Sequence, residues 1–233
     1  AREFRRGVFT SQETVRLELF GELSRFIEQT HRQKAADTAP PALLKPLQLT
    51  INSRVRHGPL PDGRTFAAAI VDSELEVEER FMPLLASALG ELKLLSVRTV
   101  YRFDGSGESK FSSPPLAFSV PGESPAASAR LSWDGFQATL QFSPGFAGYR
   151  LAAEAPKLEI LGEGVRMLMT GLRVDTQSKR ILPDEPLLYA GKQVITVAQA
   201  ALDAPGLPNR PIVLKQLSYD VHVPVDGEFI DIT

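Results

Sequence analysis

Apolar and polar residues alternate along most of this chain. In residues 14–20, "TVRLELF", Val15, Leu17 and Leu19 fall on one face of an extended strand, and the polar residues between them fall on the other. The same period of two recurs in residues 47–55, 95–103 and 131–142. Antiparallel strands with one buried face show this pattern. The sequence therefore predicts a mainly β protein.

Later segments extend the prediction. Further strands are expected at residues 147–154, 157–161, 164–175, 187–197 and 211–223, separated by glycine or proline. Asp134-Gly135 stands between two alternating runs and predicts a hairpin turn. From Val165 to Val174 apolar side chains occupy both faces, which predicts a strand that is covered on both sides.

Two helices are expected beside the strands. Residues 81–92 place Phe81, Leu84, Leu85, Ala88, Leu89 and Leu92 on one helical stripe, with Pro83 in the first turn. Residues 23–30 place fewer apolar residues on one helical side and lead into a loose connector, so the sequence leaves open whether this second helix forms. The expected fold class is mainly β within α+β: antiparallel meander sheets with one or two short helices packed on a face.

The chain is long enough for one continuous core. It has 233 residues, of which 43% are hydrophobic and 23% charged, and a single β-rich domain over residues 1–233 is expected. Residues 112–128 are rich in proline and serine and predict a long loop or a subdomain hinge. Because the chain begins at Ala1 rather than at a methionine, we expect it to be a piece of a longer protein.

Composition excludes several functions. The net charge is −2 and the basic residues are scattered, so nucleic acid is not an expected partner. No apolar run approaches the roughly 20 residues of a membrane-spanning helix. The absence of cysteine excludes disulfides, thiolate catalysis and thiolate metal sites.

Histidine is the scarcest candidate for chemistry. There are three, His31, His57 and His222, and they are far apart in the sequence. His57 ends the strand-like segment "INSRVRHGPLP", where it is either a general base or ligand or a structural residue. The structural interpretation is favoured: its ring would bond a backbone group, Gly58 would adopt a conformation closed to other residues, and Pro59 would fix a turn.

Other motifs have simple structural interpretations. Glu74, Glu76 and Glu78 alternate with apolar residues and predict the solvated face of a strand. "DGSGESK" at 104–110 predicts a hairpin turn rather than a phosphate-binding loop, and Gly162 and Gly164 flank another turn. No serine-hydrolase or zinc-protease motif occurs. We expect no metal site, no cofactor and no local catalytic motif.

Three stretches carry a family resemblance. "FRRGVFTSQ" at 4–12 and "RHGPLP" at 56–61 resemble the paired signatures of the YdgA-like family, bacterial envelope proteins of unknown function, and residues 70–118 are similar to that family's next block. The segment 22–46 is longer than the family pattern. The motif positions are Arg6, Gly7, Phe9, His57, Gly58 and Pro59.

The resemblance implies a location but no chemistry. It implies a body in the periplasm behind an N-terminal anchor in the inner membrane, upstream of Ala1, and a C-terminal half that this chain lacks. It supplies no catalytic residues.

Two functions follow as hypotheses. Many strands with an apolar face and few helices to cover it predict a non-enzymatic protein that binds or scaffolds a hydrophobic partner, either a lipid, an envelope protein or further copies of itself. The alternative is an envelope hydrolase whose site is assembled from distant residues, with His57 or His222 as base. A cleft that joined one of these histidines to a serine and an aspartate would favour the hydrolase.

Overall fold

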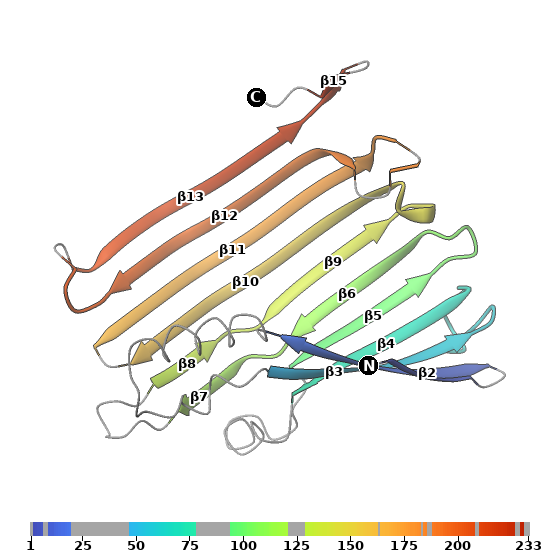
Figure 1. Ribbon diagram of the computed structural model, residues 1–233, viewed down its shortest axis with the longest axis horizontal. Helices are drawn as coiled ribbons and strands as arrows, with labels where there is room; N and C mark the ends of the chain where they lie inside the picture. The colour runs from blue at the N-terminus through green and yellow to red at the C-terminus, as the bar shows by residue number, and fades with distance from the viewer. Residues whose placement is uncertain are drawn as a thin grey trace, which may run out of the picture.

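The computed structural model describes residues 2–6, 9–19, 47–77, 94–120, 129–162, 164–182, 184–185, 188–207, 210–226 and 229–230. Within these ranges the chain forms one open antiparallel sheet of thirteen strands, with a separate two-stranded ribbon at its C-terminal end (Figure 1). The described strands that contact one another extensively are all sheet neighbours, so the described residues form a single layer.

The strands follow the chain almost in order. They are β1 (Arg2–Arg6), β2 (Thr10–Leu19), β3 (Leu47–His57), β4 (Ala69–Val77), β5 (Leu95–Tyr101), β6 (Gly107–Ser113), β7 (Leu116–Val120), β8 (Ala129–Trp133), β9 (Phe136–Phe142), β10 (Gly148–Gly162), β11 (Val165–Arg180), β12 (Tyr189–Asp203) and β13 (Ile212–Val223). The ribbon pairs β14 (Val225–Asp226) with β15 (Phe229–Ile230). In the sheet β6 is followed by β9 and β10, while β7 pairs with β8 and β8 with β10.

The mainly β, antiparallel prediction is confirmed. The predicted strands at 147–154 and 157–161 are halves of one strand, β10. The turn predicted over 104–110 is observed at 104–106, with β6 beginning at Gly107, and β10 ends at Gly162, where the sequence predicts a turn. The described residues contain no α-helix, only the short 3-10 turn Pro144–Phe146. The predicted helices over 23–30 and 81–92, like most of the 22–46 insert, lie outside the described residues, and helices packed on a face are not observed within them.

A transverse crease crosses the sheet, from the breaks between β6 and β7 and between β8 and β9 through the strands β10–β13. The ladders on either side of it place the following residues opposite one another, strand by strand from β6/β7 to β13: Pro114, Gly135, Pro156, Gly171, Ala198 and Gln216. Every second one has positive φ: 96° at Gly135, 62° at Gly171 and 54° at Gln216. Proline lacks a backbone donor and positive φ breaks a regular strand, so the ladder is interrupted along this line.

The crease corrects the prediction for Asp134-Gly135. These residues do not reverse the chain, because β8 before them and β9 after them run in the same direction and pair with the same strand, β10. A Cβ at Gly135 would lie 2.8 Å from the carbonyl oxygen of Ser113, so only glycine fits there. Likewise the proline-rich stretch 112–128 is no simple loop, since Leu116–Val120 form β7 after the break at Pro114-Pro115.

Side-chain alternation slips by one residue at the crease. Ser113 is paired with Phe136 and shares its face, whereas regular alternation would put Trp133, three residues before Phe136, on the opposite face. Instead the Trp133 indole Nε1–H donates a hydrogen bond to Ser113 Oγ at 3.0 Å. Trp133 therefore lies on the Ser113 side of the sheet.

Few apolar side chains are fully buried. Those among the described residues are Ala67, Ile70, Ala138, Phe142, Ala155 and Ala190. The prediction that Val165–Val174 is covered on both sides is wrong at its start, because Val165 and Met167 are 38% and 39% exposed. A single described layer provides nothing to cover them.

Candidate functional site

The sheet has one apolar face. Residues paired across antiparallel strands share a face, so the registers sort the side chains without ambiguity on the β1 side of the crease. The apolar face carries Ile51, Val55, Val71, Leu75, Leu95, Val97, Phe111, Phe136, Leu140, Phe142, Leu151, Leu172, Val174, Ile195, Val197, Leu217 and Tyr219. The strands that cross the crease are long, and the longest, β11, has 16 residues. The alternation in the sequence thus predicted this face.

Two pairs of hydroxyl groups on the apolar face bond each other. Ser53 Oγ lies 2.7 Å from Ser73 Oγ, and Thr99 Oγ1 lies 2.8 Å from Ser109 Oγ, in each case across neighbouring strands. Thr99 and Ser109 are buried, at 9% and 6% exposure. Since these hydroxyls satisfy each other, this part of the face offers apolar contact rather than free hydrogen-bonding groups.

His57 closes one end of this face. Its ring nitrogen Nε2 lies 3.2 Å from Ser11 Oγ, and its backbone N–H donates to the Phe9 carbonyl oxygen at 2.9 Å. The sequence predicted that the ring would bond a backbone group, and the structure shows a side-chain hydroxyl instead. His57 is exposed, whereas Ser11 is 3% exposed. The pair ties β2 to the end of β3.

The residues after His57 build a loop, as the sequence predicted. Gly58 has φ of 111° and its N–H donates to the Ala68 carbonyl oxygen, while the Pro59 carbonyl oxygen accepts from the Ala67 N–H. These two bonds close the base of the 58–68 loop. Arg6 pairs with Ser11 at the edge of β1, and Gly7, the remaining motif residue, lies outside the described residues.

The histidines do not assemble a triad in the described part of the chain. His57 reaches Ser11, but no described carboxylate bonds its ring, and the near-complete burial of Ser11 shields the hydroxyl from a substrate. His222 is exposed on β13, where it pairs with Lys192, and none of the described side chains bonds its ring. The hydrolase therefore stays an alternative without a described site.

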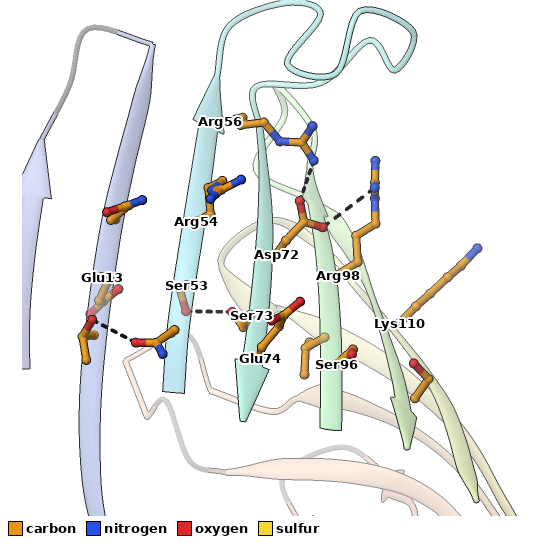
Figure 2. A pocket seen from close by; sticks show the side chains of 15 residues that line it. Glu13, Ser53, Arg54, Arg56, Asp72, Ser73, Glu74, Ser96, Arg98 and Lys110 are labelled. Carbon is orange, nitrogen blue, oxygen red and sulfur yellow. Dashed lines mark hydrogen bonds and ion pairs between the residues drawn. The ribbon is translucent and has the colours of Figure 1, made fainter. Parts of the chain in front are cut away.

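The opposite face carries a polar groove over β2–β6. Its volume is about 680 Å³, and its lining includes Arg54, Arg56, Asp72, Glu74, Arg98 and Lys110 (Figure 2). Asp72 accepts ion pairs from Arg56 and from Arg98, at 2.5 and 3.8 Å. Because most of these charges pair within the sheet, the groove presents few uncommitted groups to a ligand. Glu74 lies on this polar face, as predicted, while Glu78 is outside the described residues and the Glu76 side chain is not described.

Asp62 organises the loop between β3 and β4. Its carboxylate accepts hydrogen bonds from the backbone N–H of Thr65 and of Arg64 and from the Thr65 hydroxyl, and it pairs with Arg98. The Thr65 backbone bond is the largest cause that holds the pKa of Asp62 far below its usual range. Asp104 has the same function in the β5–β6 turn, where the Ser106 hydroxyl and N–H lower its pKa.

Sequence reasoning missed the aromatic contacts at this end of the sheet. The rings of Phe66 and Phe103, from two different loops, have centroids 5.1 Å apart, and those of Phe142 and Phe146 stack at 4.5 Å. The sequence does carry a phenylalanine in four of the turns at this end, at Phe9, Phe66, Phe103 and Phe146, but a turn residue has no periodic pattern that would mark it.

The described residues contain no cluster of three or more histidine or acidic side chains suited to a metal ion. Nor does any helix within the described ranges have the length and apolar character of a membrane span. The whole chain, residues 1–233, matches the model of DUF945, a bacterial protein family of unknown function, and the chain belongs to that family. No curated protein and no solved structure matches it.

Proposed function

We propose that this DUF945 protein binds lipid acyl chains along the apolar face of its sheet and performs no covalent chemistry. The observation that supports this most directly is the face itself: it runs across β3–β13, and the hydroxyls of Ser53 and Ser73, and of Thr99 and Ser109, are paired within it. A ligand that matches such a surface is a long apolar chain without hydrogen-bonding groups, and a lipid acyl chain is such a ligand. A protein partner would instead need about one hydrogen bond per 100–200 Å² of interface area.

The slip at the crease supports the length of the site. On the far side of the crease the apolar residues of a strand change from odd-numbered to even-numbered positions, or the reverse. They are Leu131 and Trp133 in β8, Leu158 and Ile160 in β10, Met167 and Met169 in β11, and Ala200 and Leu202 in β12. With side-chain alternation slipped as Trp133 indicates, these residues continue the apolar face. A strand of 16 residues is about 50 Å long at 3.3 Å per residue, which exceeds an extended acyl chain.

The proposal is tested on protein purified without detergent. An organic-solvent extract analysed by mass spectrometry should contain acyl lipid in stoichiometric amount, and native mass spectrometry should show the complex. A ligand-free monomer that also fails to take up added fatty acid would refute the proposal.

A second candidate is association through the edge of the sheet. The outer edge of β13 pairs with no other described strand, and β13 exposes Ile212, Leu214 and Tyr219 at 40%, 50% and 58%. A long apolar edge strand is a template for strand addition, whether from a second copy or an envelope protein. Size measurement across a range of protein concentrations tests self-association, and a monomer at every concentration would exclude it.

The proposed compartment is the periplasm, with an anchor in the inner membrane. It rests on the resemblance to the YdgA-like envelope proteins, and the absence of cysteine is compatible with it. A reporter active only outside the cytoplasm, fused to the full-length protein, should be active. A silent but well-expressed fusion would contradict this location.

A further inference from the structure

Eight large apolar residues are exposed at one end of the sheet. The β-ladders bring the C-terminal end of β3, β5, β9 and β11 next to the N-terminal end of β2, β4, β6, β10 and β12, so the connecting loops lie in one row, at the upper right of Figure 1 for β9–β12. The exposed residues are Phe9 73%, Leu60 54%, Phe66 73%, Tyr101 39%, Phe103 59%, Phe146 42%, Leu182 47% and Leu188 37%. We call them the loop-end row.

The three loops that carry Phe66, Phe103 and Phe146 are held in place by polar contacts. Asp62 ties the loop of Phe66, and Asp104 ties the turn of Phe103. Arg180 Nη2 donates to the carbonyl oxygen of Gly145, and the Tyr189 hydroxyl donates to that of Phe146. The apolar rings are therefore presented to solvent by ordered loops rather than left there by loose ones, and their exposure costs hydration free energy in the isolated protein.

The row is continuous with the apolar face. Phe142, on the face, stacks on Phe146 of the row and lies 5.6 Å, centroid to centroid, from Tyr101. An acyl chain that leaves the apolar face at this end would meet the loop-end row first.

The geometry fits a bilayer better than a protein. The row follows the end of a single layer across the strands β2–β12, at about 4.8 Å per strand, so it is long and narrow rather than a compact patch with a central pocket. The exposed Arg64 and Arg102 stand beside Phe66 and Phe103 in sequence, and the neighbouring acids Asp62 and Asp104 are committed to their own loops. In these two loops an exposed ring next to a cation suits the interface of an anionic membrane, where rings enter the acyl region and arginines meet phosphates.

We infer that the loop-end row docks this protein on the surface of a phospholipid bilayer. The inference goes beyond acyl-chain binding by the sheet face, because it rests on the exposure of loops and stands if the face binds nothing. Combined with the proposed function, it makes the row the end at which lipid enters or leaves.

The test is flotation with vesicles of phosphatidylethanolamine and phosphatidylglycerol. The parent protein should float, and Phe66→Ser combined with Phe103→Ser should lower its partition coefficient by at least about tenfold. The matched control is Val213→Ser, which removes an exposed apolar side chain from the opposite face of β13, far from the loop-end row, and it should float like the parent. Fatty-acid binding in solution, measured on the same variants, should not change.

A second readout follows the ring into the membrane. Phe66→Trp in a Trp133→Phe background should show a blue-shifted emission with vesicles and quenching by brominated acyl chains, whereas Val213→Trp in that background, on the opposite face of β13, should show neither. A parent that does not float, a Phe66/Phe103 variant that floats equally well, or a β13 control that loses as much would each overturn the inference. A parent that floats but binds no fatty acid in solution would instead count against the proposed function alone.

Discussion

The hydroxyl groups of Ser53 and Ser73 lie 2.7 Å apart on β3 and β4, within the apolar face. Replacing either one by alanine leaves the other without this partner, and a part-buried unpaired hydroxyl costs about 1 kcal/mol. The double replacement removes both groups and should cost less than the sum of the single replacements. Urea unfolding of the three variants measures the coupling. Additive effects within about 0.3 kcal/mol would show that the pair does not satisfy itself.

A comparison of Gly171, at the crease, with Gly145, in the β9–β10 turn, separates the cost of backbone strain from the cost of crowding. Their φ values are 62° and 61°, but a Cβ at Gly171 would lie 2.8 Å from the Ala198 Cβ, whereas one at Gly145 would meet nothing within 4 Å. Both alanine variants should lose about 1–2 kcal/mol to backbone strain. Gly171→Ala should lose at least about 1 kcal/mol more from the forced contact.

The crowding part of that loss can be rescued. Ala198→Gly in the Gly171→Ala background removes the atom in the way and should restore part of the stability beyond its own cost as a single variant. Equal losses at Gly171 and Gly145 in thermal or urea unfolding would contradict the close approach of β11 and β12 at the crease.

Asp62 predicts an acid transition in the 58–68 loop. Its pKa is lowered in the folded state, so its contribution to stability is fully present above its usual pKa of 3.8 and is lost as the pH falls toward the lower folded value. The protection factor of the Thr65 amide, which is its intrinsic exchange rate divided by its observed rate at the same pH, should therefore fall below about pH 4 in the parent. In Asp62→Ala the protection factor of the same amide should be low at every pH. A Thr65 amide with identical pH dependence in both proteins would refute this assignment.

His57 should matter to stability more than its exposure suggests. His57→Ala removes the bond between the ring and the buried Ser11 hydroxyl and should lower the free energy of unfolding by about 1 kcal/mol. His222→Ala is the matched control on β13, and it should change the stability by less than about 0.5 kcal/mol. Gly58→Ala should cost more than His57→Ala, because φ there is 111°. Unshifted melting temperatures for both His57→Ala and Gly58→Ala would return the motif to a functional interpretation.

The period of two in the sequence predicted the strands because each strand has one polar and one apolar side. It could not predict the path of the chain at Asp134-Gly135, since the same dipeptide suits a hairpin turn and a strand break with positive φ. Which one forms depends on Pro114 and Pro156 on the neighbouring strands, and these are distant in the sequence. The sequence did not predict the loop-end row for a related reason. Phe66 and Phe103 are 37 residues apart in the chain and come into contact only through the pairing of β4 with β5.

The loop around His57 was predicted more closely than its partner. Glycine at positive φ and the proline turn follow from local chemistry, and both are observed. Ser11 was not identified as the group on the ring, because only the register of β2 on β3 brings the two together.

The central claim, that the apolar face binds acyl chains, is tested most directly through Trp133. It is the single tryptophan of the chain, and its indole bonds Ser113 on the apolar face. Fatty acids brominated along the chain quench a tryptophan only on contact, so titration should quench Trp133 saturably in the parent. Ile195→Arg, which charges the apolar face, should abolish the quenching, and Val194→Arg, the adjacent residue on the opposite face, should leave it unchanged. A parent that is quenched no more than free tryptophan, or an equal loss in both arginine variants, would contradict the account.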